Sequence, residues 1–419
     1  MGTLQVQAQR APDRIQGQAI TLQVWHTYNV AETAQFVKEG NAFQKANPSV
    51  KLNLYSIPYQ QRETKVPTAV QTNTLPDILR ADYPYQFYLA ALGKALPLDE
   101  YMKGWDGWKD IPAWLIKGAT YKGHIVTVPM QPWPLALFYN KTLFKRAGIA
   151  GPPKTWAEFI SDGKKLTKNG VAGFEVIGDT QNGFGFPFAS ILAMMGASLF
   201  KDPNNPTPAG VNLTSPQARK AVQLWSQLLT NHIVEPDVVA NGFNDMIQNF
   251  QSGKVAMAMD GSWEIGTYAA QKGLDYGVAP LPALPGAPYR VFAGYSLYVI
   301  PSTTKYPQQA AKTLEWLLSK SNVAQWSTSL GEIPALRQSV ESSPQMGTYL
   351  SDHPSYKAFD YPPSSYAPFF SVNPPVPYFN AISDAAAKVL QEWYLGRITE
   401  AQVLPRMQQA VQAVVKANM

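Results

Sequence analysis

The chain has 419 residues, of which 45% are hydrophobic and 15% charged, and its formal net charge is +6. This length exceeds what one hydrophobic core usually holds, so two domains are expected. The basic residues are dispersed along the chain, whereas a nucleic-acid-binding surface usually shows a clustered basic stripe. Nucleic acid is therefore not expected as a partner.

Composition also limits the chemistry of the protein. Cysteine is absent, which excludes disulfides, thiol catalysis and cysteine-based zinc sites. The histidines are far apart in sequence, so no metal site is expected. No hydrophobic stretch approaches the roughly 20 residues of a membrane-spanning helix. Residues 1–19 predict a flexible lead-in without the hydrophobic core of a signal peptide, so an exported protein would have had that peptide removed.

The first part of the chain alternates predicted strands and helices. Residues 20–25 alternate apolar and polar side chains, which predicts a strand. The elements that follow are expected to be helix 31–46, strand 50–57, helix 63–72, strand 76–79 and helix 88–93. A β-α-β-α-β order predicts a parallel sheet with right-handed crossover connections.

Two further strands are predicted at residues 124–129 and 135–139, on either side of a segment that contains Gln131 and Trp133 between prolines. Asn140 then opens a short helix, and Gly148 suits its left-handed end. Thr155 with Glu158 three residues later is typical of a capping box, in which each side chain bonds the other residue's backbone amide.

The rest of the chain is mostly helical. Ser215 and Pro216 suit the N-cap and first position of one helix, and Thr399 with Gln402 predicts a capping box on the last helix. Residues 255–259 are wholly apolar, as buried parallel strands are. The other predicted elements are helices 188–199, 216–231, 244–252, 308–319, 322–329, 378–394 and 400–417, and strands 276–280 and 295–300.

Candidate ligand-binding residues follow from this order of elements, because ligands of open α/β sheets gather beyond the carboxyl ends of the strands. Tyr295 and Tyr378 are weaker candidates, since packing explains them equally well. The candidates in the loops after strands and at the expected crossing are Trp25, Thr27, Tyr28, Asn29, Arg80, Asp82, Tyr83, Gln131, Trp133, Asp260 and Trp263.

These residue types suit a sugar. A pyranose has an apolar face of C–H groups that an aromatic ring can cover, and a rim of hydroxyls that must be hydrogen-bonded when buried. Asp82 and Asp260 can each accept from two hydroxyls, and a charged acceptor strengthens the bond. No catalytic residue is needed for such binding.

Several segments, in this order, resemble the maltose-binding type of extracellular solute-binding protein, the sugar-binding component of ATP-driven importers. The segments are FQKANPSV (43–50), LPDIL (75–79), ALPLD (95–99), YKGHIVTVP (121–129), residues 138–159, FQSGKVAMAMDGSW (250–263), YGVAPLP (276–282) and GEIPAL (331–336). The resemblance covers nearly the whole chain from residue 20.

The resemblance implies an α/β fold of two lobes, each a mainly parallel sheet flanked by helices, with the ligand in the cleft at the hinge. Lobe one is expected at residues 20–131 and 290–336, and lobe two at 136–286 and 337–419. The crossings are expected near 130–135, 285–290 and 333–338. The sugar contacts implied by the resemblance are Thr27, Asn29, Asp82, Tyr83, Trp133, Phe186 and Trp263.

The resemblance also implies partners and location. We expect a carbohydrate ligand, a di- or oligosaccharide, and the membrane permease of an importer as a partner. We expect no cofactor, a monomer, and an extracytoplasmic location, in a periplasm or on a lipid anchor. One departure concerns the first crossing, where Trp133 stands at a position that often carries a carboxylate. The identity of the sugar is therefore open.

Two alternatives to sugar binding are open from the sequence. The same fold can bind a glycerophosphodiester or a polyamine, and Arg80 leaves a phosphate ligand open. A glycoside hydrolase would need two carboxylates that flank the scissile bond. Asp260 and Glu264 are the conceivable pair, but both lie on one loop, which suits flanking poorly.

Overall fold

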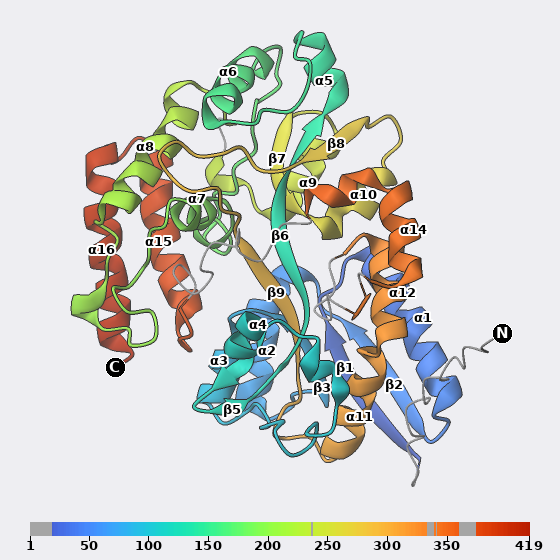
Figure 1. The fold of residues 1–419 in the computed structure, drawn as a ribbon. Helices are drawn as coiled ribbons and strands as arrows, with labels where there is room; N and C mark the ends of the chain where they lie inside the picture. The colour runs from blue at the N-terminus through green and yellow to red at the C-terminus, as the bar shows by residue number, and fades with distance from the viewer. Residues whose placement is uncertain (1–18, 236–237, 333–338, 341, 360–373) are drawn as a thin grey trace, which may run out of the picture.

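The computed structural model describes residues 19–235, 238–332, 339–340, 342–359 and 374–419. Its helices and strands form two groups, one on either side of the middle of the long strand β6 (Val128–Asn140), which runs through both (Figure 1). The first group holds the elements of the N-terminal third together with β9 (Ala293–Val299) and the two helices that follow it directly, α11 (Pro307–Leu317) and α12 (Lys320–Leu330).

In the first group, β1 (Ile20–His26) lies between β2 (Val50–Ser56) and β3 (Ile78–Asp82) and is parallel to both. The predicted β-α-β-α-β unit is confirmed. Phe36 and Phe43 of α1 are fully buried and belong to the same apolar core as Leu22 and Val24 of β1. The helices of this group are α1 (Val30–Ala46), α2 (Arg62–Thr72), α3 (Tyr85–Ala91), α4 (Ala113–Ala119), α11 (Pro307–Leu317) and α12 (Lys320–Leu330), and a small hairpin joins β4 (Thr120–Tyr121) to β5 (His124–Ile125).

The remaining pairs of strands are antiparallel. β9 pairs with β3 and with the first half of β6, while β7 (Met257–Gly261) and β8 (Tyr276–Ala279) pair with its second half. The expectation of a mainly parallel sheet in each lobe therefore holds for β1, β2 and β3 only. The apolar stretch predicted as a parallel strand forms an antiparallel one, with a single parallel bridge from Val255 to Ala172.

The two strands predicted around Trp133 are one continuous strand, which corrects the sequence-based expectation. Pro132 and Pro134 lie inside β6, in the half where the described ladders pair it with β9 alone. Proline lacks a backbone N–H donor, so it is tolerated in a strand whose one edge makes no hydrogen bonds to another strand. From Leu135 onward, β7 and β8 pair with β6 instead.

The second group is mainly helical and encloses the second half of β6. The predicted caps are confirmed at Asn140, at Thr155 with Glu158, at Ser215 and at Thr399. Its helices are α5 (Lys141–Arg146), α6 (Trp156–Leu166), α7 (Ala189–Met194), α8 (Pro216–Thr230), α9 (Phe243–Gln251), α10 (Ile265–Ala269), α14 (Pro344–Asp352), α15 (Phe379–Tyr394) and α16 (Glu400–Ala417).

Short helical turns join several of these elements. A single π turn, η3 (Phe184–Phe188), precedes α7, and the 3-10 turns η1 (Tyr59–Gln61) and η6 (Ser262–Glu264) precede α2 and α10. The lobe boundaries predicted from the sequence stay predictions, and the expected crossing at 333–338 lies outside the described residues. Among the described helices, none combines the length and the apolar character that crossing a membrane requires.

Candidate ligand-binding cleft

Two adjoining cavities, of about 280 and 290 Å³, lie where the two groups of elements face each other. We name them the Asp384 chamber and the Trp263 chamber, after a residue that lines only one of them. The residues that line both, and so join the chambers into one cleft, are Thr27, Tyr59, Arg80, Asp82, Trp133, Asn182 and Phe186.

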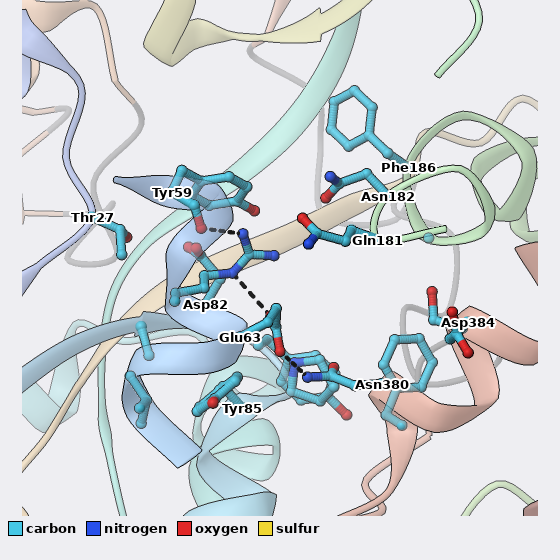
Figure 2. A pocket seen from close by; sticks show the side chains of 18 of the residues that line it. Thr27, Tyr59, Glu63, Asp82, Tyr85, Gln181, Asn182, Phe186, Asn380 and Asp384 are labelled. Atoms are coloured by element: carbon cyan, nitrogen blue, oxygen red, sulfur yellow. Dashed lines mark hydrogen bonds and ion pairs between the residues drawn. The ribbon is translucent and has the colours of Figure 1, made fainter. Parts of the chain in front are cut away.

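The Asp384 chamber is lined by polar groups from both sides of the cleft (Figure 2). From the first group, Arg62 lies over the ring of Tyr59, 3.7 Å from its centroid, and pairs with Glu63 at 3.2 Å. Asn380 of α15 donates a hydrogen bond to Glu63 from the opposite side. Gln181 and Asn182, which precede η3, also line this chamber.

The Trp263 chamber has aromatic walls. Trp263 follows β7 in η6 and contacts three other rings, with centroid distances of 5.9 Å to Trp133, 6.2 Å to Phe186 and 6.5 Å to Phe243. Tyr59 lies 5.8 Å from Phe243 and extends the cluster to the other side of the cleft. All five side chains are part-exposed, so their rings offer apolar surface to the cavity.

A hydrogen-bonded network positions Asp82 at the end of β3. Arg80 donates to Asp82 at 2.9 Å, to the hydroxyl of Thr27 at 2.7 Å and to the hydroxyl of Ser296 at 2.6 Å. Ser296 lies opposite Asp82 in the antiparallel β3–β9 ladder and donates to it at 3.0 Å. This pairing fixes the carboxylate of Asp82 at the cleft with a defined orientation.

Three buried polar atoms of residues in the Trp263 chamber have no hydrogen-bond partner. They are Arg80 Nε, Gln131 Oε1 and Glu264 Oε2. A buried polar atom without a partner costs about 1–3 kcal/mol. Burial raises the pKa of Glu264 to about 7. A hydrogen bond with Thr267 opposes this shift, and the nearby carboxyl group of Glu32 adds to it.

Hydrogen bonds connect the two sides of the cleft. The side-chain amide of Asn29, which caps α1, donates to the backbone carbonyl of Trp263 at 3.1 Å. Asn244 of α9 donates to Gln60 of η1 at 3.0 Å. Together with the bond from Asn380 to Glu63, these contacts hold the two groups of elements against each other around the chambers.

The structure brings most of the sequence-predicted site residues together. Trp133 and Phe186 line both chambers, and Asp82 and Thr27 do so from the opposite side. The predicted residues that line at least one chamber are Thr27, Tyr28, Asn29, Arg80, Asp82, Tyr83, Gln131, Trp133, Phe186 and Trp263.

The other predicted residues line neither chamber, which corrects their placement. Trp25 packs against Tyr55, with ring centroids 5.8 Å apart. Asp260 is fully buried and accepts bonds from the hydroxyl of Tyr268 and the amide of Gly261, both at 2.8 Å. The enzyme alternative therefore loses one of its two carboxylates.

The two tyrosines considered weaker candidates also lie outside the chambers. Tyr295 is fully buried, and its hydroxyl accepts a bond from Gln86 at 3.0 Å. Tyr378 is half-buried at the position before α15. Its neighbour Phe379, the first residue of that helix, lines the Asp384 chamber.

Sequence reasoning missed several lining residues. The segment after β2 contributes Tyr59, Arg62 and Glu63. It follows the carboxyl end of a strand, so the rule that ligands gather beyond these ends, which selected Thr27, also selects this segment. Phe243, Asn380 and Asp384 lie near the starts of helices with no local signal of a ligand. The arrangement of the two groups in space brings them to the cleft.

Comparison with known proteins gives the family. The family model for bacterial extracellular solute-binding proteins matches residues 40–356. The chain is 27% identical to the maltodextrin-binding protein MdxE of Bacillus subtilis (strain 168) over 325 residues, 75% of this chain and 73% of that protein. It is 26% identical to the sn-glycerol-3-phosphate-binding periplasmic protein UgpB of Salmonella typhimurium over 355 residues, 80% of this chain and 79% of that protein.

A solved structure confirms the predicted two-lobed α/β fold. An ABC transporter solute-binding protein from Thermotoga lettingae, bound with alpha-D-tagatose, superimposes with a TM-score of 0.83 at 25% identity and covers 94% of this chain and 99% of that one. Such proteins bind ligands and are not enzymes, and they act outside the cytoplasm. The chain belongs to the family of bacterial extracellular solute-binding proteins.

Proposed function

We propose that this protein captures a carbohydrate, a di- or oligosaccharide, in the cleft and delivers it to the membrane permease of an ATP-driven importer. The observation that carries the proposal is the aromatic cluster around Trp263 beside polar groups without partners. Aromatic faces suit the C–H face of a sugar ring, and buried polar atoms suit its hydroxyls.

The donor and acceptor chemistry of the cleft supports a polyhydroxylated ligand. Gln131 Oε1 and Glu264 Oε2 are acceptors without partners, and Arg80 Nε is a donor without one. A hydroxyl both donates and accepts, so one sugar ring can satisfy groups of either kind. Asp82, held in place by Arg80 and Ser296, adds a charged acceptor.

The relatives support the same class of ligand. MdxE is named for maltodextrin, and the Thermotoga lettingae structure holds tagatose. Two adjoining chambers, rather than one, suit a ligand of more than one ring. We therefore assign the sugar contacts to the predicted residues that line the chambers, and we add Tyr59, Glu63, Asn182, Phe243 and Asp384.

Delivery needs a change of shape that a permease can recognise. Contacts such as Asn29 to Trp263 and Asn244 to Gln60 connect the two sides of the cleft, so ligand contacts from both sides would favour the closed form over the open one. We propose that the protein works as a monomer, with no cofactor, and that the closed form is the one the permease recognises.

The relationship to UgpB raises the alternative of a glycerol phosphate ligand. The charges that line the Trp263 chamber oppose it, since Glu32, Asp82 and Glu264 face the single guanidinium of Arg80. Arg80 is itself paired with Asp82 at 2.9 Å. A phosphate would therefore meet an excess of carboxylates.

A thermal-shift panel tests the proposal. The purified protein is heated with maltose, maltotriose, cellobiose, sn-glycerol 3-phosphate or spermidine, each in large excess. A ligand of the native state raises the unfolding midpoint, by at least about 2 °C at concentrations far above its Kd. We expect a carbohydrate to give the largest rise. A rise with glycerol phosphate or spermidine alone would replace carbohydrate with that ligand class, and release of monosaccharides would indicate a hydrolase.

A further inference from the structure

Buried carboxyl groups form a series from one side of the cleft to the other. Glu264 interacts electrostatically with Asp260 behind it and with Glu32 of α1 across the cleft, and Glu32 interacts with Glu332, which follows α12. Each of these four side chains is 5% exposed or less. Ionised carboxylates at such depth are costly unless they are paired or hydrogen-bonded.

Glu264 and Glu332 each have one carboxyl oxygen without a hydrogen-bond partner, and of these two only Glu264 lines the Trp263 chamber. Asp260, Glu32 and Glu332 each accept hydrogen bonds from nearby donors at 2.6 to 2.8 Å. Glu264 Oε2 has no partner, although the residue lines the Trp263 chamber. In the described part of the chain, no ion pair includes any of the four.

The Trp263 chamber therefore contains more carboxyl groups than cations. Its lining contains the carboxyl groups of Glu32, Asp82 and Glu264 against the guanidinium of Arg80. Arg80 pairs with Asp82, and burial raises the pKa of both glutamates, so an added cation would favour their ionised form. The walls beside them are the rings of Trp133, Trp263, Phe186, Phe243 and Tyr59. Aromatic faces attract a cation, more strongly where the site is shielded from water.

We propose that the carbohydrate carries a protonated amine, as an amino sugar does, and that this amine lies in the Trp263 chamber between Glu264 and Glu32. The inference rests on the proposed carbohydrate function and adds the charge of the ligand. A protonated amine offers donors to both carboxylates, and its charge offsets the repulsion between them.

The same amine would promote closure of the cleft. Glu32 and Glu264 belong to opposite sides, so closing the cleft brings two carboxyl groups into a poorly solvated space where their ionised forms are costly. A neutral sugar leaves that cost in place. An ammonium group between the carboxylates makes the closed form more favourable, because it interacts with both sides at once.

Proton release distinguishes this amine from a neutral ligand. Because burial holds the pKa of Glu264 near 7, part of this carboxyl group is protonated at neutral pH, and a bound cation would expel the proton. The other titratable and charged groups that face this series are Tyr28, Glu32, Arg80, Asp82, Asp260, Tyr268 and Glu332.

The test uses three dimers with the same linkage, measured by calorimetry at pH 7: the β-1,4-linked dimer of glucosamine, its N,N′-diacetyl form, and cellobiose. The amine dimer should bind at least about tenfold more tightly than both neutral dimers. Its binding enthalpy in phosphate and in Tris buffer should differ by an amount that corresponds to proton release. Cellobiose should show no such release.

Two variants test whether Glu264 causes the amine preference and the proton release. Glu264→Gln keeps the shape of the side chain and should abolish both the amine preference and the proton release. Glu175→Gln is the matched control, a buried glutamate of the second group that is bonded to Asn241 and Asn249 outside the cleft, and it should retain both.

Each contrary result overturns a defined part of the account. An amine dimer that binds no better than the neutral ones overturns the inference, and cellobiose binding in that case leaves the carbohydrate function intact. If Glu264→Gln still binds the amine dimer more tightly than the neutral dimers, the amine does not bind at Glu264. Failure of all three dimers also overturns the inference, while the carbohydrate panel decides the function independently.

Discussion

At the scale of single residues, the cleft combines side chains that the sequence pattern identifies with others that it cannot. Trp263, Asp82 and Thr27 follow strands, and the rule about carboxyl ends of strands selects them. Asp260 meets the same rule, but it accepts a bond from Tyr268 of α10 and lies away from the cleft. Position after a strand does not determine which way a side chain points.

Buried glutamates make stability depend on pH. Burial raises the pKa of Glu175 to about 8, with the Glu235 carboxylate adding to the shift, and that of Glu39 and Glu264 to about 7, from an ordinary value of 4.5. The folded state therefore binds protons more tightly than the unfolded state. The stability from these groups is complete below about pH 4.5 and is lost as the pH rises through the folded values.

We therefore predict that the ligand-free protein has a lower free energy of unfolding at pH 8.5 than at pH 6.5, measured by urea denaturation. His26 contributes in the opposite direction only below its ordinary value of 6.5, because burial lowers its pKa to about 4. Glu175→Gln should reduce the difference between the two pH values. Equal or greater stability of the wild-type protein at pH 8.5 would contradict this account.

At the scale of elements, local signals predicted helix starts well and the course of β6 poorly. Capping boxes such as Thr155 with Glu158 depend on residues three apart, so a short stretch of sequence contains the whole signal. The continuity of β6 through Pro132 and Pro134 depends on its pairing with β9, which lies more than 150 residues later in the chain. In this half of β6, β9 pairs with only one of its two edges. No local pattern could show that partner.

The two capping boxes of α1 and α6 provide a matched comparison. Asn29→Ala and Thr155→Ala should each lower stability by about 0.5–2 kcal/mol, because each removes an N-cap acceptor. Only Asn29 also lines the Trp263 chamber and donates to Trp263 across the cleft, so only its loss should weaken binding of the carbohydrate. Denaturation and calorimetry on both variants measure the two effects.

A result in which Thr155→Ala weakens binding as much as Asn29→Ala does would contradict the role of the cross-cleft bond. In that case stability alone would explain the loss of affinity. Equal stabilities with unequal affinities would support a role of Asn29 at the cleft most clearly, since both residues cap a helix and only Asn29 lines a chamber.

At the scale of the whole molecule, the order of segments predicted the two-lobed architecture, which the comparisons confirm. The lining of the cleft was predicted only in part. Residues such as Phe243 and Asp384 reach it because elements from distant parts of the chain meet across the chambers. The lining of the cleft thus depends on how the two groups are arranged in space, and no single segment of the sequence contains that information.

The central claim is that the cleft around Trp263 binds a carbohydrate. The most direct measurement is a calorimetric titration of the wild-type protein, Trp263→Ala and Trp25→Ala with the sugar that raises the unfolding midpoint most. Trp263→Ala should lose at least about tenfold in affinity, because it removes an aromatic platform. Trp25→Ala, which removes a tryptophan outside the chambers, should bind as the wild type does. Unchanged affinity of Trp263→Ala would contradict the account.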